Sequence, residues 1–353
     1  MLREILSRFL LVCASVLVFL VAGEASVRLY RMWKYAENPF RLAAYPQGSM
    51  ELDSYLGWKA IAHFRRPPEW QMDAQGNKHL LSFSQGEDGF RAYGSLDSAK
   101  PRIFVLGDSY THAEAVSDDE TYYAVAGRLL GAEIFAYGVD GYGTLQEYMV
   151  LDRYIDRLRP SLIIWQFCTN DFLNNSRALE SGSVGNNPFA IRPYWEDGRI
   201  IRAFPIKQSV GRYVPYWIQH SRLFRLLLGR MRILFAQRFG NREVYQQILA
   251  GGRRQEFAAS VAVTDQLFTK LKERAGSVPI IALDCECDQP YHEAFKTLAA
   301  RHGIPVVEQV NRSVTAALQS GIAVRARDGT HWNSTGHKLV GEAIASYLKQ
   351  RGF

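Results

Sequence analysis

The chain has 353 residues, of which 47% are hydrophobic, enough for a large core in one domain or in one domain with appendages. The net charge is +7, but residues 201–240 hold eight Lys or Arg and no Asp or Glu, which leaves −1 for the rest of the chain. The basicity is therefore local, and no known nucleic-acid-reading module accompanies it, so we expect no nucleic-acid partner.

Residues 1–34 carry a membrane signal. An unbroken apolar run of 15 residues extends from Phe9 to Gly23. A spanning helix needs roughly 20 residues, and the run reaches that length if the residues after it join the helix, with Glu24 and Arg28 reaching toward the interface. The sequence Gly23-Glu24-Ala25 also resembles a cleavage site, so a cleaved signal is the alternative. We favour an uncleaved anchor, with residues 35–353 on the periplasmic side of the inner membrane, because long C-terminal domains translocate largely regardless of flanking charge.

Residues 35–353 are expected to form one domain. Its lead-in, residues 35–100, is rich in turn signals and is predicted to be small and β-rich. From Pro101 onward, short apolar runs alternate with helical patterns, which is typical of a parallel α/β sheet. Strands are predicted at 102–106, 133–137, 162–167, 279–283 and 304–307.

Helix starts are predicted from capping boxes at Ser117-x-x-Glu120 and Thr144-x-x-Glu147, which open helices to about residues 130 and 158. Helical spacing of apolar residues predicts a last helix over 334–349. A long basic insertion, residues 174–253, separates the third and fourth strands. We expect in it a hairpin near 192–200 and a helix over 220–239, whose arginines scatter around the helix axis. A solvated surface helix is the simplest interpretation, with a membrane-surface contact or a grip on an anionic substrate as alternatives.

The four cysteines do not form a disulfide framework or a metal site. They are Cys13, Cys168, Cys285 and Cys287, and the spacing of the last two is too tight for a zinc knuckle. We therefore expect no metal. Cys168 and Cys285 each lie near the end of a predicted strand, so a bridge between them is an alternative to buried free thiols.

Polar residues that can carry chemistry follow the predicted strands. Ser109 comes directly after the first strand, in Gly107-Asp108-Ser109, and Asn170 comes after the third. Ligands bind at the carboxyl ends of strands in open α/β sheets, and neighbouring strands would bring these side chains to one crevice. A serine there can act as a nucleophile, and an amide can donate to an oxyanion. The loop after the second strand holds Gly138, Gly141 and Gly143, which permit close backbone approach to a ligand.

The base is expected just before the last helix. His331 can accept a proton, and Asp328, three residues earlier, can hold its ring. His112 lies near Ser109 but has no evident carboxylate partner, so it is the weaker base candidate. His337 is predicted to lie on the helix surface.

These blocks together resemble the SGNH (GDSL-type) hydrolase superfamily. The matching residues are Ser109 in GDSY, Gly141 in GVDGYGT, Asn170 in CTND, and Asp328 and His331 in DGTHWN. Tyr137 stands where the second block often begins with Asn. The resemblance implies a flavodoxin-like parallel five-stranded sheet, order 2-1-3-4-5, with helices on both faces. It also implies ester hydrolysis or acyl transfer, with an oxyanion hole made of the Ser109 and Gly141 N–H groups and the Asn170 amide.

The expected function is a membrane-anchored serine esterase that hydrolyses a carbohydrate- or lipid-linked acyl ester through Ser109, His331 and Asp328, without a metal or cofactor. Two alternatives stay open. The Asp-x-Thr-His-Trp segment is similar to exported SGNH-like proteins that O-acetylate bacterial exopolysaccharides, which suggests an O-acyltransferase acting on an extracytoplasmic polysaccharide. The other is a non-catalytic glycan-binding or assembly protein, although such a role does not need the complete set of polar residues.

Overall fold

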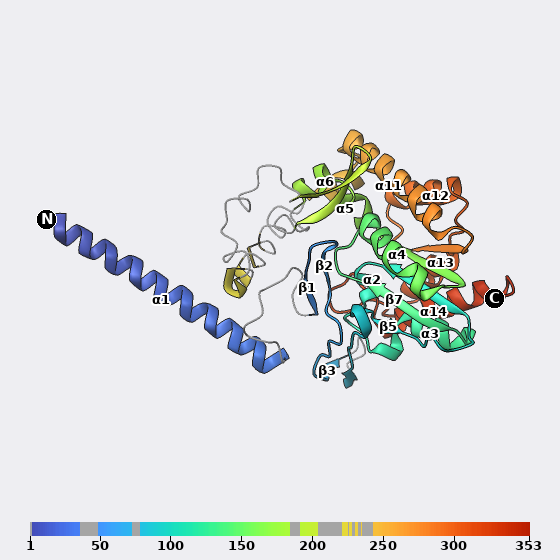
Figure 1. Ribbon diagram of the computed structural model, residues 1–353, viewed down its shortest axis with the longest axis horizontal. Helices are drawn as coiled ribbons and strands as arrows, with labels where there is room; N and C mark the ends of the chain where they lie inside the picture. The colour runs from blue at the N-terminus through green and yellow to red at the C-terminus, as the bar shows by residue number, and fades with distance from the viewer. Residues whose placement is uncertain are drawn as a thin grey trace.

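The first helix lies outside the α/β core and contacts the segment that begins at Ser221. The computed structural model describes residues 2–35, 49–72, 78–183, 191–203, 221–224, 226, 227, 230, 231, 234 and 243–353. Helix α1 (Leu2–Tyr35) projects as a rod from the α/β core (Figure 1). In the described part of the chain it is the one helix long and apolar enough to cross a membrane, by length and composition, and none of its apolar stretch is buried.

A five-stranded sheet forms the centre of the fold, in the order β11-β8-β6-β7-β5. Four strands are parallel and match the predicted order 2-1-3-4: β7 (Glu133–Gly138), β6 (Arg102–Gly107), β8 (Leu162–Phe167) and β11 (Ile280–Asp284). Residues Tyr137, Leu106 and Trp165 lie side by side across three of them. These strands read as continuous apolar runs because helices cover both faces of a parallel sheet.

The prediction of a fifth parallel strand over 304–307 is wrong in extent. That segment makes one parallel bridge, between Val306 and Ala282, supported by Ala282 N–H to Pro305 O and Val307 N–H to Ala282 O, both 2.8 Å. It cannot extend, because Pro305 has no N–H and α13 (Glu308–Gln319) begins at once. The fifth strand is instead β5 (Ala92–Tyr93), which pairs antiparallel with β7 at the opposite edge.

Helices pack on both faces of the sheet, as predicted, and give two apolar cores. Side chains of β8 alternate between them: Ile163 and Trp165 point into one core, and Leu162 and Ile164 into the other. The first core is closed by α4 (Thr144–Leu158), α11 (Arg254–Ala275) and α12 (Tyr291–Arg301). The second is closed by α3 (Tyr122–Leu130), α13 and α14 (Ser334–Lys349).

The first capping box forms, but it begins a different element. Ser117 N–H donates to Glu120 Oε2 at 3.1 Å and opens the 3₁₀ turn η2 (Asp118–Glu120). Helix α3 starts only after Thr121, whose side chain accepts from Ala124 N.

The second capping box is wrong. Helix α4 does begin at Thr144, but Thr144 Oγ1 donates to Asp171 Oδ1 at 2.9 Å, and Glu147 Oε2 accepts from Trp165 Nε1 at 2.5 Å. Both side chains point into the protein, where they provide hydrogen-bond partners for buried polar groups. Neither side chain is therefore available to cap the helix.

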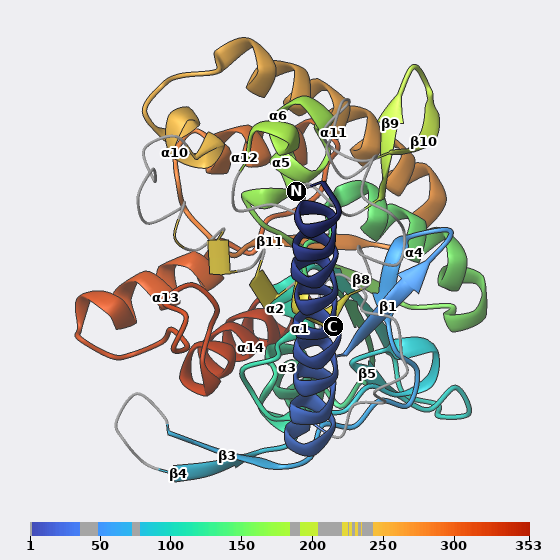
Figure 2. The ribbon, with the colours of Figure 1, turned by 90° about the vertical axis from the view of Figure 1, so that its left-hand side faces the viewer.

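The lead-in contains short hairpins, of which the first packs on the core. They are β1 (Met50–Asp53) with β2 (Gly57–Ala60), and β3 (Glu69–Met72) with β4 (Lys78–Leu81), the latter extending away from the core (Figure 2). Trp58 of β2 is fully buried. Its indole N–H donates to Asp140 O at 3.0 Å, and its carbonyl accepts from Tyr142 Oη at 2.6 Å. The lead-in therefore holds the loop that follows β7.

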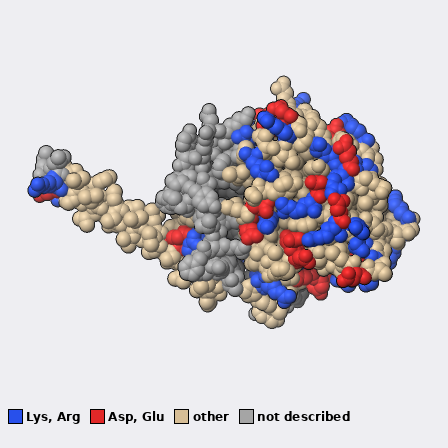
Figure 3. Space-filling view, viewed as in Figure 1, with Lys and Arg blue, Asp and Glu red and all other residues tan. Residues whose placement is uncertain are grey.

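The insertion contains short helices and the predicted hairpin. After α5 (Asn170–Asn174) and α6 (Arg177–Gly182), β9 (Arg192–Glu196) pairs with β10 (Arg199–Ala203), and α10 (Val244–Leu249) leads into α11. Of the predicted helix over 220–239, residues 222–224, 226, 227, 230, 231 and 234 are helical, residue 221 is not, and the others lie outside the described residues. Elsewhere, on the face in Figure 3, Lys and Arg are interspersed with Asp and Glu.

Candidate active site

Ser109 begins a single helical turn at the carboxyl end of the central strand. Strand β6 ends at Gly107, and α2 (Ser109–His112) follows with Asp108 as its N-cap, whose side chain accepts from Tyr110 N at 3.0 Å. The turn is so tight that a Cβ on Gly107 would lie 2.2 Å from Gln166 Oε1. Glycine is required here by close approach, and it presents the serine at the edge of the sheet.

Three side chains that lie far apart in the sequence form one chain of hydrogen bonds. His331 Nε2 lies 2.8 Å from Ser109 Oγ, and His331 Nδ1 lies 2.5 Å from Asp328 Oδ2. The other oxygen of Asp328 accepts from the backbone N–H groups of Thr330 and His331 at 2.9 and 3.0 Å. The carboxylate is thus fixed by its own loop, and it fixes the ring. This is the geometry of a nucleophile, a general base and an orienting carboxylate.

The charges in this group favour a base that holds its proton well. Burial alone would raise the pKa of Asp328, but hydrogen bonds from His331 and Thr330 lower that pKa to about 2. Burial disfavours the His331 cation, yet the hydrogen bond and charge of Asp328, followed by the charges of Asp140 and Asp108, raise the pKa of His331. Burial raises the pKa of Asp108 to about 6.

Two of the expected oxyanion donors, Gly141 and Asn170, lie in neighbouring segments that are joined by hydrogen bonds. Gly141, in the loop after β7, has a positive φ of 74°, which glycine adopts readily. Asn170 is the first residue of α5, and its Nδ2 donates to Tyr142 O at 3.2 Å. Gly141 O accepts from Arg192 Nη2 at 2.7 Å and Asn174 Nδ2 at 3.2 Å. These two contacts fix the Gly141 carbonyl so that it points toward the insertion.

A second layer of residues, which the sequence did not reveal, supports the His331 loop. Tyr110 Oη donates to Thr330 O at 3.0 Å, and Arg325 donates to both Tyr110 Oη and Thr330 O. The Tyr110 ring also packs against the His331 ring, with centroids 4.9 Å apart. Only the position of Tyr110 beside Ser109 could have suggested this role.

Two expectations about histidines are wrong. His112 does have a carboxylate partner, since its Nδ1 lies 2.7 Å from Asp140 Oδ1. The partner comes from the loop after β7, next to Gly141, which spacing along the chain could not indicate. His337 is not on the helix surface: it is buried, and its Nδ1 accepts from Tyr122 N at 3.1 Å. Burial lowers the pKa of His337 to about 3, so it is neutral and joins α14 to the start of α3.

The cysteines are free thiols, and the alternative bridge does not form. Cys168 and Cys285 are buried, and burial raises the pKa of each thiol well above its ordinary value. Neither is suited to act as a nucleophile, because reactive cysteines have lowered pKa values.

The hydrogen-bonded group can accept an acyl group onto Ser109 and pass its proton to His331. The side chains of His331 and Asp328 are 33% and 48% exposed, so water or a second substrate has access to the base. Among the described residues, one cluster offers three metal-ligand types close together, His112, Glu114 and Asp140. It lies beside the site, since His112 belongs to the Ser109 turn and Asp140 directly precedes Gly141.

Comparison with known proteins identifies the family of the chain. Residues 105–339 match the family model described as GDSL-like Lipase/Acylhydrolase family. A search of curated proteins found no match. Similar solved structures include a lipolytic protein of the G-D-S-L family from Veillonella parvula, with 14% identity, a TM-score of 0.40, and coverage of 70% of this chain and 98% of that one.

Two further structures are similar at the same level. The lipase/acylhydrolase from Enterococcus faecalis has 14% identity and a TM-score of 0.39, and the match covers 71% of this chain and 96% of that one. Axe2, an acetylxylan esterase from Geobacillus stearothermophilus, has 15% identity and a TM-score of 0.39, with 72% and 95% covered. The family model spans more than half of the chain, includes Ser109 and His331, and confirms the SGNH resemblance: the chain is an enzyme of the GDSL-like lipase/acylhydrolase family.

Proposed function

We propose that the protein is a membrane-anchored serine esterase that uses Ser109, His331 and Asp328. The observation that carries the proposal is the continuous hydrogen-bond chain from Ser109 Oγ through both nitrogens of His331 to Asp328. A serine hydroxyl is a weak nucleophile at neutral pH, and a base at 2.8 Å is what activates it.

The reaction proceeds in two steps. Ser109 Oγ attacks the acyl carbonyl as its proton moves to His331 Nε2, and Asp328 stabilises the resulting imidazolium. The alcohol leaves with that proton, and an acyl-enzyme remains. Water then gives a proton to His331 and attacks the acyl carbon, after which the acid leaves and Ser109 regains its proton. The N–H groups of Ser109 and Gly141 and the Asn170 amide serve as oxyanion donors in both steps.

Acyl transfer to a sugar hydroxyl is the second candidate, and two observations favour it. The Asp-x-Thr-His-Trp segment, which carries the resemblance to O-acetylating proteins, contains Asp328 and His331. The side chains of these two residues are exposed enough to admit an acceptor larger than water. A sugar hydroxyl would replace water in the second step with the same proton transfers. Product analysis with and without an oligosaccharide acceptor separates the two: an acylated glycan supports transfer, and free acid alone supports hydrolysis.

Membrane attachment through α1 is part of the proposal. Its middle is uncharged, and its charges lie near its ends (Figure 3). Glu24, just after the apolar run, accepts from Ser221 Oγ at 2.7 Å, Arg222 N at 3.0 Å and Leu223 N at 2.8 Å. The basic helical segment thus begins where the anchor would leave the bilayer. Its exposed apolar residues would then meet the membrane surface: Leu226, Leu227, Met231 and Leu234.

The first experiment is labelling of the detergent-solubilised full chain with a fluorophosphonate probe. We expect labelling of the wild type, and loss of both labelling and ester turnover in Ser109→Ala. Retained turnover in purified Ser109→Ala would refute the assignment of the nucleophile. Alkaline carbonate extraction and protease digestion of spheroplasts test the anchor: release by carbonate, or a domain that resists digestion, would overturn the topology.

A further inference from the structure

His112 is paired with a carboxylate, as a general base would be, but neither of its ring nitrogens is available. It lies one helical turn after Ser109, and its ring is fully buried. Both ring nitrogens are occupied: Nδ1 lies 2.7 Å from Asp140 Oδ1, and Nε2 lies 2.9 Å from the Gln85 side-chain amide and 3.3 Å from Ser49 Oγ. No nitrogen of this ring is left to take a proton from Ser109. Its role must therefore come from the residues that it positions.

The neighbours of the ring are all acceptors. Asp140 offers a carboxylate oxygen to Nδ1. In the amide orientation that gives every neighbouring group a partner, the Gln85 nitrogen donates to two backbone carbonyls and its oxygen accepts from His112 Nε2 at 2.9 Å. Ser49 uses its hydroxyl proton on Glu114 at 2.7 Å, so it presents a lone pair to the ring. Each of these neighbours can accept a hydrogen bond, and both ring nitrogens are engaged, Nδ1 by a carboxylate oxygen of Asp140 and Nε2 by Gln85 and Ser49.

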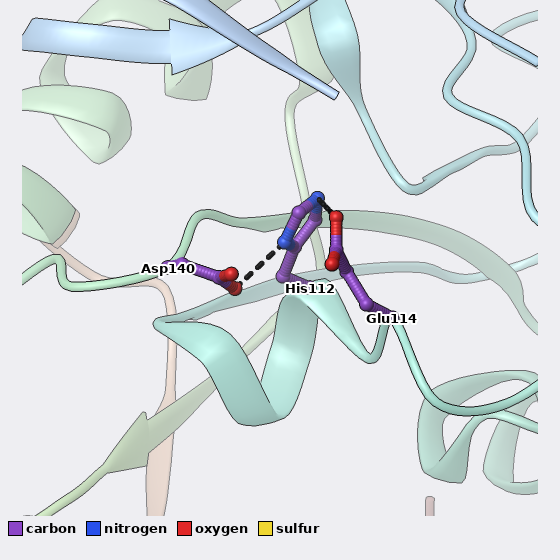
Figure 4. Close-up of side chains that lie close together, drawn as sticks. All are labelled: His112, Glu114 and Asp140. Carbon is purple, nitrogen blue, oxygen red and sulfur yellow. Dashed lines mark hydrogen bonds and ion pairs between the residues drawn. The ribbon is translucent and has the colours of Figure 1, made fainter. Parts of the chain in front are cut away.

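A metal ion does not explain the cluster. The ligand atoms of His112, Glu114 and Asp140 lie within 4.8 Å of one another, but the two carboxylates approach different nitrogens of the ring (Figure 4). A ring nitrogen binds a metal along its own lone pair, so an ion on one nitrogen cannot take both carboxylates as ligands. The arrangement is that of a hydrogen-bonded clamp.

The clamp joins the loop that carries Gly141 to the turn that carries Ser109. On one side Asp140 directly precedes Gly141, and its carbonyl accepts from Trp58 Nε1 at 3.0 Å. On the other side, His112 N–H donates to Asp108 O at 2.8 Å, and Ala113 N–H donates to Ser109 O at 2.9 Å. The two backbone N–H groups assigned to the oxyanion hole are therefore connected through one side-chain bond.

Other hydrogen bonds hold the loop mostly by its carbonyls, and Tyr142 Oη bonds to Trp58 O. Arg192 and Asn174 bond to Gly141 O, and Asn170 bonds to Tyr142 O. Of these side chains, Asn170 also forms a hydrogen bond with the Asp108 side chain, so it links the loop to the Ser109 turn through a third segment. Among the described residues, the bond from His112 to Asp140 is the side-chain hydrogen bond that joins the two donor-bearing segments directly.

We propose that the His112–Asp140 pair is a positioning device for the ester reaction, which sets the spacing between the Ser109 and Gly141 N–H groups in the oxyanion hole. The inference rests on the proposed function of those groups. Misplacement of a catalytic group by about 1 Å can cost on the order of 100-fold in rate, so loss of the pair is expected to lower kcat while substrate binding changes little.

The test is a double-mutant cycle on the full chain in detergent. We expect His112→Phe and Asp140→Ala each to lower kcat by about 10- to 100-fold with KM changed less than about threefold, and the double variant to be no slower than the slower single one. Affinity for an alkyl boronic acid, whose tetrahedral adduct places an oxygen in the oxyanion hole, should fall by a similar factor. Asp140→Asn keeps an acceptor for the ring and should restore most of kcat.

His302→Phe is the matched control, because His302, at the end of α12, forms a similarly short bond, 2.6 Å, to Asp265 of α11. It should leave kcat and boronate affinity unchanged. Additive losses in the cycle, or unchanged kcat in either single variant, would overturn the proposal. If His112→Phe does not fold, Asp140→Ala against Asp140→Asn still decides it, because the Asp140 side chain is 31% exposed and tolerates truncation. Failure of the proposed function itself shows separately, as turnover that survives in Ser109→Ala.

Discussion

The buried His337 makes the stability of this protein sensitive to acid in a way that can be measured. Its folded-state pKa is lowered to about 3, first by burial and then by the positive charges of Arg91 and His331. In the unfolded chain the pKa is the ordinary value of 6.5. The stabilisation is fully present above that value and is lost as pH falls below it, because only the unfolded chain then takes up the proton. At about pH 5 the loss is about 2 kcal/mol, since each pH unit below 6.5 costs about 1.36 kcal/mol.

The variant that isolates this effect is His337→Asn. The Asn oxygen can accept from Tyr122 N in place of Nδ1, but it does not titrate. Urea unfolding of the detergent-solubilised chain, followed by Trp fluorescence at about pH 7.5 and about pH 5, gives the free energy of unfolding for each protein. The wild type should lose about 2 kcal/mol more than the variant between the two pH values.

Loss of ring packing will lower the stability of His337→Asn at both pH values, so the difference between them is the informative quantity. His63→Asn is the control. His63 is exposed and has a φ of 55°, which Asn tolerates, and this change should leave the wild-type pH dependence intact. Equal losses in the wild type and in His337→Asn would refute the reasoning.

Three further predictions concern the site. Asp328→Asn should lower kcat by about 10²- to 10⁴-fold, and it should move the acid limb of the kcat/KM profile to lower pH, because the carboxylate that raises the pKa of His331 is gone; an unmoved limb would contradict this. Asn170→Ala should lower kcat by about 10²- to 10³-fold with KM nearly unchanged, as steady-state kinetics on a nitrophenyl ester will show, and a pure KM effect would argue against an oxyanion donor. Gly138→Ala would place a Cβ 2.5 Å from Thr111 Cβ, so urea unfolding should show a loss of stability of about 1–3 kcal/mol or more. Unchanged stability would mean that the packing between Gly138 and Thr111 is less tight than this distance indicates.

Sequence patterns predicted the fold where one local period decides it. Four apolar runs became the four parallel strands in the predicted order, because a fully covered strand must be apolar along its length. The same reasoning failed over 304–307, where an apolar run begins a helix after one bridge. The order of strands also predicted that Ser109 and Asn170 lie in one crevice at the carboxyl ends of neighbouring strands, since parallel strands end on the same side. His331 was expected just before the last helix, and the tertiary structure brings it to Ser109. Their catalytic roles stay proposals.

Side-chain partners, by contrast, were decided by tertiary structure alone. Glu147 fits a capping box by spacing, yet it bonds Trp165, because a buried indole N–H must find an acceptor. His337 occupies a helix position that spacing assigns to the surface, and it is buried because α14 packs on α3. The carboxylate that bonds His112 Nδ1 is not Glu114, two residues away along the chain, but Asp140, which the fold supplies from the loop after β7. Period and composition fix which residues face inward in an element, but the identity of a contact depends on segments that only the folded chain brings together.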